Sequence, residues 1–160
     1  MAGRISAVTG LPYHPVDDLT WEPGWREVPL DEQRRRIVCI CAQDEWILDS
    51  AYGKWLDIPM ARVQLIVGLD YPRWRSLGRL LRRTAIRLVD RQTVCNGNHE
   101  SLRGVVSRDS ILVWHFRSFA HKRARIRDWA ADPGGPVAHR ITTPAQAAAL
   151  LAQLRRTGVE

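Results

Sequence analysis

Short apolar runs alternate with amphipathic helical patterns along this chain, and that alternation constrains the fold more than any other feature. The runs at 46–48, 63–69 and 137–141 have the length and apolar content of buried strands. Strands that alternate with helices pair in parallel, so we predict an α/β fold with a parallel sheet. The segments with helical spacing of apolar residues are 2–9, 31–43, 73–91, 109–130 and 144–158.

Three of these helix boundaries are marked by residues with a known local role. Gly10 follows the helix expected over 2–9, in the position where glycine most often ends a helix. Thr143-Pro144-Ala145-Gln146 has the spacing of a capping box, with proline at the first helical position, so a helix should begin there. Asp132-Pro133-Gly134-Gly135-Pro136 should end the helix expected over 109–130.

Length and composition limit the classes of protein to which the chain can belong. Its 160 residues suit one domain, since domains hold about 100 to 200 residues. Hydrophobic residues make up 45% of it, which excludes wholesale disorder. No apolar run approaches the roughly 18 residues of a bilayer helix, and no secretory signal begins the chain. The three cysteines are an odd number, so we expect a cytoplasmic protein without disulfides or a membrane partner.

The positive charge is concentrated in one part of the chain. Residues 71–127 hold 14 of the 24 lysines and arginines but only three acids, whereas residues 1–70 hold more acids than bases. All but two of the basic residues are arginines. The planar guanidinium fork matches phosphate oxygens better than an ammonium group does, so we expect an anionic partner at residues 71–127.

The helix expected over 73–91 carries arginines at every fourth position. Like charges at this spacing repel by about a few tenths of a kcal/mol per pair, and no acid precedes Asp90 on this helix. A polyphosphate or a nucleic-acid backbone would relieve the repulsion, and so would solvation or ion pairs with the acidic first half of the chain. The stripe is Arg79, Arg83, Arg87 and Arg91, and the residues expected to face the core are Trp74, Leu77, Leu81, Ala85 and Leu88.

Three aspartates follow short apolar or extended segments. Asp17, Asp49 and Asp70 fall where such segments end, and in open α/β sheets ligands bind at the carboxyl ends of the strands. A carboxylate there can hold Mg²⁺ through water or orient an acceptor hydroxyl. Each of the three can also be a helix N-cap or a turn residue. Their succession favours a ligand site.

The order of these elements, together with six short motifs, resembles a known family over nearly the whole chain, from about residue 2 to residue 155. The motifs that carry the likeness are Leu11-Pro12, Asp17, Trp21-x-Pro-Gly-Trp25, Trp46-Ile-Leu-Asp49, Leu69-Asp-Tyr-Pro-Arg-Trp74 and Asn96-Gly-Asn-His-Glu-Ser101. With these motifs the chain is similar to the adenylate-kinase-like P-loop proteins that are labelled topology modulation proteins.

The resemblance implies a fold and an activity. The fold would be a single three-layer α/β domain over residues 1–160, with a parallel sheet of the P-loop NTPase and nucleoside-monophosphate-kinase type and an arginine-rich helical lid over approximately 79–108. The activity would be that of an ATP-dependent kinase acting on a small molecule or a nucleotide, with ATP and Mg²⁺ as cofactors. Lids of this kind exclude water and bring arginine to the transferring phosphoryl group.

The resemblance also implies roles for individual residues, in three groups. The lid would supply the catalytic arginines Arg79, Arg82, Arg83 and Arg87. The nucleotide would be bound by Asp49, Asn96, Asn98 and Arg103, with Asp49 also near Mg²⁺. The acceptor substrate would be bound by Asp17, Trp21, Trp25 and Tyr52. The identity of the acceptor and the oligomeric state stay open.

The chain departs from the family at its phosphate-binding loop. The pattern GxxxxGK[ST] is absent, and Gly53-Lys54, the only Gly-Lys pair, is followed by Trp55. The family usually also has Gly-Asn where Ser50-Ala51 follows Asp49. Aligned with the family, Met1 falls inside the helix after the loop, so a central strand should be missing. We expect a start codon upstream of Met1 rather than a repurposed domain, and ATP affinity weaker than micromolar for the 160 residues.

A second function from another class fits the same residues. The basic region over 73–127 could be a nucleic-acid-binding module without catalytic activity, with Trp74, Trp114 and Phe119 available for base stacking. Nucleic-acid binding would weaken steeply with salt and require many arginines, whereas a nucleotide site would depend on Mg²⁺ and on a few of them.

Overall fold

In a computed structural model of the protein, the structure describes residues 1–49, 53–90, 93–94, 96–99 and 111–157. The chain divides into two compact units, and each is described by itself: unit 1 is Met1–Gln64 with Thr143–Glu160, and unit 2 is Leu65–Thr142. Both units contain helices and a pair of parallel strands, which confirms the predicted α/β class. Across the described residues, no helix combines the length and the apolar character needed to cross a bilayer.

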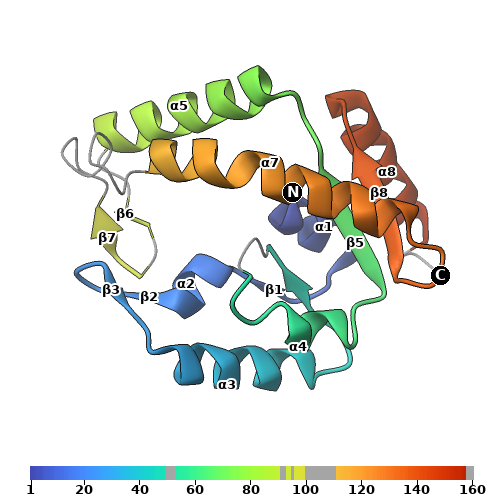
Figure 1. The fold of residues 1–160 in the computed structure, drawn as a ribbon, viewed down its shortest axis with the longest axis horizontal. Helices are drawn as coiled ribbons and strands as arrows, with labels where there is room; N and C mark the ends of the chain where they lie inside the picture. The colour runs from blue at the N-terminus through green and yellow to red at the C-terminus, as the bar shows by residue number, and fades with distance from the viewer. Residues whose placement is uncertain (50–52, 91–92, 95, 100–110, 158–160) are drawn as a thin grey trace. The chain divides into compact units, whose positions relative to one another are not determined.

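Unit 1 is built on short strands and five helices among its described residues (Figure 1). Strand β1 pairs in parallel with β4, and β2 pairs antiparallel with β3. The elements are α1 (Ala2–Thr9), β1 (Tyr13–His14), α2 (Val16–Thr20), β2 (Trp21–Glu22), β3 (Arg26–Glu27), α3 (Leu30–Cys41), β4 (Ile47–Leu48), α4 (Asp57–Met60) and α8 (Pro144–Thr157).

The core of unit 1 forms around α3. Ile37 and Cys41 of α3 pack with Val16 of α2 and with Trp55, and all four are at most 2% exposed. Trp55 donates its indole N–H to the side chain of Gln33 at 3.2 Å. The amide of Gln33 in turn donates to the carbonyl of Val28 at 2.7 Å, so the buried polar groups of this core are hydrogen-bonded.

Both local boundary signals in unit 1 are confirmed. Helix α1 ends at Gly10, whose φ of 78° is the left-handed conformation that favours glycine. At the start of α8, the backbone N–H of Gln146 donates to the Thr143 hydroxyl at 3.3 Å, and the N–H of Thr143 donates to the Gln146 side chain at 3.2 Å. These reciprocal bonds are the capping box that the spacing predicted. Helices α1 and α8 pack against each other.

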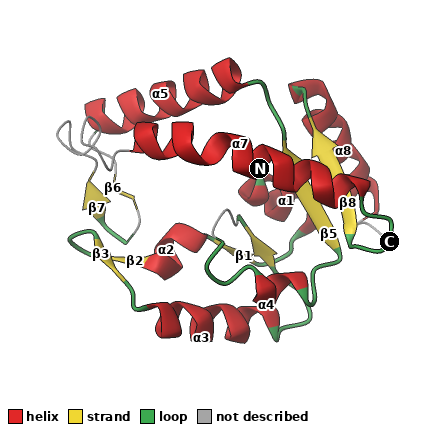
Figure 2. Cartoon of the chain, in the orientation of Figure 1, coloured by secondary structure: helices red, strands yellow, loops and turns green. Residues whose placement is uncertain are grey.

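Unit 2 has a longer parallel pair. Strand β5 (Leu65–Leu69) pairs with β8 (Val137–Ile141) along its whole length, from Leu65 opposite Val137 to Leu69 opposite Ile141 (Figure 2). The ladder continues one residue further, where the N–H of Asp70 donates to the carbonyl of Ile141 at 2.8 Å. The other described elements of unit 2 are α5 (Arg73–Val89), β6 (Thr93–Val94), β7 (Asn98–His99) and α7 (Ile111–Ala131).

A glycine lets α7 approach the strand pair closely. A Cβ atom at Gly68 of β5 would overlap the Cγ2 atom of Ile126 on α7. Ile126 therefore packs directly on the backbone of β5, and α7 also contacts β8. Arg123 and Arg127 lie three residues before and one residue after Ile126 on α7. The contact of Ile126 with Gly68 thus sets how close these two arginines lie to the end of β5, which Asp70 follows.

The predicted core face of α5 is wrong at Trp74, Leu81 and Ala85, which are exposed, the first by 69% and the second by 47%. Leu77 of that face is half-buried, and so is Leu80, while Thr84 is buried. The structure does not describe the side chain of Leu88. Helices α5 and α7 pack side by side (Figure 1). Several apolar series at helical spacing overlap in this helix because leucines occur at 77, 80 and 81, and the packing partner decides which one is covered.

Each parallel pair has strands with one partner. In the described part of the chain, β4 pairs only with β1, and β5 pairs only with β8. The second hydrogen-bonding edge of each of these strands therefore has no strand partner among those residues.

Candidate anion-binding site

A buried carboxylate gathers three arginines at the end of β5. The side chain of Asp70, directly after β5, is 0% exposed, and it accepts bonds from Arg123 and Arg127 of α7 and from Arg140 of β8. The N···O distances are 2.5 Å for Arg123, 3.2 Å for Arg127 and 2.6 Å for Arg140. We call these four residues the Asp70 arginine cluster, and all of them lie in unit 2.

The geometry of the three contacts leaves most donors of the cluster available. In each arginine, the Nε atom is the one that binds Asp70. A guanidinium group has five N–H donors, of which four are on the terminal Nη atoms. Within the described residues, no second carboxylate lies within ion-pair distance of these guanidinium groups, whose side chains are 36%, 48% and 40% exposed. The terminal donors are therefore accessible to a ligand.

The charge of the cluster is strongly unbalanced. Three guanidinium groups share one carboxylate. Burial raises the pKa of the Asp70 carboxyl, but hydrogen bonds from Arg140, Arg123 and Arg127 lower it by more, so that its pKa lies below the ordinary value. Asp70 is thus ionised near neutral pH, and an excess of two positive charges remains at the end of β5.

Aromatic rings extend the positive region to α5. Phe119 of α7 has the guanidinium of Arg73 4.8 Å from its ring centroid and that of Arg123 at 6.0 Å. Arg73 also lies 5.5 Å from the ring of Phe116. A cation over an aromatic face is held without a carboxylate, so its charge is not neutralised. Arg73, at the start of α5, therefore adds a further positive charge beside the Asp70 arginine cluster.

The cluster can bind a multiply charged oxyanion. Guanidinium groups form bidentate, charge-assisted hydrogen bonds with phosphate and carboxylate oxygens. Asp70 holds the Nε side of each group, so the terminal amino groups are oriented before a ligand arrives. Preorganised donors bind an anion better than free side chains, because less rotamer freedom is lost on binding.

The strand-end aspartate of unit 1 has a different environment. Asp49, directly after β4, accepts a bond from the Tyr13 hydroxyl at 2.5 Å and from the backbone N–H of Val16 at 2.8 Å. The second bond satisfies the first N–H of α2. Burial raises the pKa of Tyr13, and the hydrogen bond to Asp49 and the charges of Asp49, Asp17 and Asp18 raise it further. Asp17 and Asp49 are thus brought close to the same tyrosine.

Two of the expected acceptor-binding residues lie on the β2–β3 hairpin. Trp21 and Trp25 pack edge to face, with ring centroids 6.0 Å apart. Trp25 has a φ of 58°, which is uncommon for a non-glycine residue, and it is 44% exposed. Tyr52 lies outside the described residues.

The expected lid residues do not join the Asp70 arginine cluster in the described part of the chain. The guanidinium of Arg79 lies 4.5 Å from the ring of Tyr71, while Arg82 and Arg83 are exposed. Arg87 is in the last turns of α5, and the structure does not describe its side chain. Asn96 lies in the turn between β6 and β7 with a φ of 61°, and Asn98 is buried in β7. Arg103 lies outside the described residues.

The donor set for Mg²⁺ is incomplete among the described residues. They contain no group of three or more histidine, cysteine, aspartate or glutamate side chains placed to hold a metal ion. Both oxygens of Asp49 already accept bonds from protein donors.

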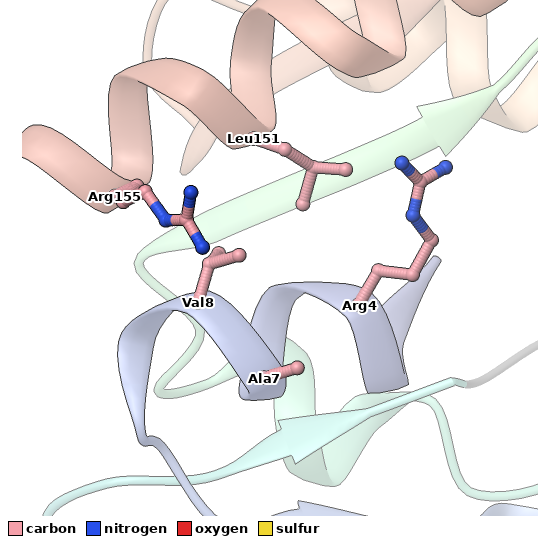
Figure 3. A pocket seen from close by; sticks show the side chains of 5 residues that line it. All are labelled: Arg4, Ala7, Val8, Leu151 and Arg155. Atoms are coloured by element: carbon pink, nitrogen blue, oxygen red, sulfur yellow. The ribbon is translucent and has the colours of Figure 1, made fainter.

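A shallow groove lies between α1 and α8 in unit 1 (Figure 3). Its volume is about 280 Å³, and none of the residues predicted for a site lines it. Its two arginines, unlike those of the Asp70 arginine cluster, have no described carboxylate that orients them. The lining residues are Arg4, Ala7, Val8, Leu151 and Arg155.

Sequence reasoning included Arg123 and Arg127 in the basic region over 71–127 without giving either a role, and it did not consider Arg140. The arginine stripe of α5 was the predicted anion site, whereas the arginines of the cluster come from α7 and β8. A usable signal was present: Arg123 and Arg127 are four residues apart and so share a helix face, and Asp70 was already singled out as a strand-end acid. Only the pairing of β5 with β8 brings Arg140 to that acid.

Comparisons with protein-family models, with curated proteins and with solved structures gave no match to this chain.

Proposed function

We propose that this protein binds the phosphate groups of a nucleotide at the Asp70 arginine cluster, as a nucleotide or small-molecule kinase of the adenylate-kinase-like type. The observation that carries the proposal is the set of three guanidinium groups held by their Nε atoms on one buried carboxylate. A nucleotide polyphosphate carries several negative charges, and the cluster has an excess of positive charge and oriented terminal donors to match it.

The position of the cluster in the fold supports the same conclusion. Asp70 follows a strand of a parallel pair, and ligands of open α/β sheets bind at the carboxyl ends of strands. The resemblance predicts a kinase fold with a parallel sheet, and each unit contains a parallel pair of strands.

In a phosphoryl transfer, the arginines would stabilise the charge that spreads over the oxygens of the transferring group. Arg123, Arg127 and Arg140 would bind those oxygens through their terminal amino groups, and Asp70 would keep the groups in place. Arg79, Arg82, Arg83 and Arg87 would remain the expected lid. The roles given to these arginines do not depend on Mg²⁺.

Calorimetric titration of the whole chain with ATP, tripolyphosphate and adenosine at low ionic strength tests the proposal. We expect ATP and tripolyphosphate to bind at about millimolar Kd, since the chain has no glycine-rich phosphate loop, and adenosine not to bind. Arg127→Gln should weaken ATP about tenfold or more, because a hydrogen bond to a charged group contributes about 1.5–3 kcal/mol.

The matched control is Arg155→Gln, an exposed arginine of unit 1 that should leave the Kd unchanged. Asp70→Asn removes a negative charge, so simple charge counting predicts tighter binding, whereas loss of orientation predicts weaker binding. We expect weaker binding. Equal affinities of the wild type and Arg127→Gln, or binding of adenosine as strong as that of ATP, would contradict the proposal.

A further inference from the structure

The outward face of α5 presents an apolar stripe that is exposed in the part of the chain that the structure describes. Trp74 is 69% exposed and Leu81 is 47% exposed, and Ala85 follows at the same helical spacing. Between them, a Cβ atom at Gly78 would meet nothing within 4 Å. Large exposed aromatic side chains are uncommon on a protein surface without a partner, so this stripe indicates a contact surface.

A row of arginines runs beside the apolar stripe. The 17 residues of α5 contain no acid, and in the part of the chain that the structure describes none of these arginines forms an ion pair with a carboxylate. Arg75, Arg79 and Arg83 are four residues apart, about 6 Å along the helix axis, and Arg82 precedes Arg83 directly, so the backbone positions of these arginines form one row. The arginines of this row are Arg75, Arg79, Arg82 and Arg83.

The guanidinium of Arg75 lies 5.1 Å from the Trp74 ring centroid. This contact covers one side of the indole, and the ring still stays mostly exposed. An indole supported in this way is a stacking platform whose orientation is already set.

We propose that the outward face of α5 binds a single-stranded nucleic acid, with a base stacked on Trp74 and the phosphates along the arginine row. Stacking needs an unpaired base, which a single strand offers and a duplex does not. The row of positive charges without acids suits the repeated negative charge of a nucleic-acid backbone. This surface shares no residue with the Asp70 arginine cluster.

Two other occupants fit the surface less well. A lipid bilayer would require a broad apolar face, but here Gly78 lies between one tryptophan and one leucine, and the small Ala85 follows. An acidic protein would not require an aromatic ring with an open π-face. The experiment below tests both occupants as competitors of the oligonucleotide.

The test is fluorescence anisotropy of a labelled thymidine oligonucleotide with the full chain over a range of salt concentrations. Trp74→Phe should keep the affinity within about threefold, and Trp74→Leu should lower it about 5- to 150-fold, since a leucine has no π-face for the base. Each of Arg75→Ala, Arg79→Ala and Arg82→Ala should reduce the slope of log affinity against log salt by about 0.7. Trp74, Arg79 and Arg82 are exposed and Arg75 is half-buried, and melting curves check that each variant is folded.

Arg155→Ala in α8 is the matched control for a loss of positive charge, and it should leave binding less affected than any α5 variant. Absence of oligonucleotide binding at low salt would overturn the proposal. Equal affinities of Trp74→Leu and the wild type would overturn it too, since the arginines would then bind any polyanion without a stacked base. Displacement of the oligonucleotide by anionic vesicles or polyglutamate as effectively as by unlabelled single strand would overturn it as well. Asp70→Asn should leave oligonucleotide binding intact, which separates this result from failure of the nucleotide site.

Discussion

At the scale of single residues, Asp70 has two effects that point in opposite directions. Its negative charge opposes an anionic ligand, but its two oxygens hold three Nε atoms and so orient the donors that such a ligand needs. Replacing one partner of a buried ion pair leaves an uncompensated charge, which is the costly part of such a change. In the Asp70 arginine cluster the arginines are partly exposed, so water compensates some of that cost.

The lowered pKa of Asp70 makes stability depend on pH in a defined direction. Its pKa in the folded chain lies below the unfolded value of about 3.9, so the stabilisation is fully present above that pH and is lost as pH falls through the folded pKa. We expect the free energy of unfolding to decrease below about pH 4. Asp70→Asn should be less stable than the wild type by about 1.5–3 kcal/mol at pH 7. Its free energy of unfolding should also decrease less than that of the wild type as the pH falls below about 4.

Urea unfolding followed by circular dichroism at a series of pH values measures both effects. If the free energy of unfolding decreases equally with falling pH in Asp70→Asn and in the wild type, other carboxylates account for the loss. Glu27 and Asp57 also have lowered pKa values, through hydrogen bonds from Lys54 and Arg34, but both variants keep these pairs.

At the scale of elements, the contact of α7 with β5 determines whether the cluster forms. Gly68 lets Ile126 lie on the strand backbone, and Arg123 and Arg127 flank Ile126 on the same helix. A side chain at 68 would push α7 away from the strand. Both arginines would then move away from Asp70 along with their helix.

We expect Gly68→Ala to lower the free energy of unfolding by about 1–3 kcal/mol, because isoleucine is stiff at Cβ and cannot move aside without strain. Gly68→Ala combined with Ile126→Ala should recover part of that loss, with a favourable coupling energy in a double-mutant cycle. Chemical unfolding of the four proteins gives the coupling. Additive effects would show that the two positions do not touch.

At the scale of the whole molecule, the chain forms unit 1, passes through unit 2 and returns to unit 1. The Asp70 arginine cluster lies entirely in unit 2, and the contacts among Tyr13, Asp49 and Val16 lie entirely in unit 1. Each unit has a parallel pair in which one edge of a strand has no described strand partner. Buried backbone groups need hydrogen-bond partners, so these edges must meet water or another segment.

Hydrogen exchange distinguishes these possibilities for β5. Backbone N–H groups alternate in direction along a strand, and the N–H of Asp70 points to β8. The N–H of Gly68 therefore also faces β8, whereas those of Val67 and Leu69 face the other edge. We expect the amides of Val67 and Leu69 to exchange much faster than that of Gly68 in NMR measurements. Comparable protection at all three would mean that another segment pairs with this edge.

The sequence by itself determined the local elements of this protein. Glycine at a helix end, the capping box at Thr143 and Gln146, and the apolar run at 137–141 each depend on neighbouring residues only, and the structure has them where the sequence predicts. The parallel pairing of the α/β class also followed from the alternation of strands and helices. The family, its kinase activity and its cofactors stay predictions.

Tertiary structure alone decided which residues meet. The apolar series of α5 allowed more than one buried face, and packing left Trp74 exposed. Asp70 was visible as a strand-end acid, but Arg123 lies 53 residues away and Arg140 lies 70 residues away. Such a contact depends on strand register and on the close approach of α7 at Gly68, and neither of these is a property of a local segment.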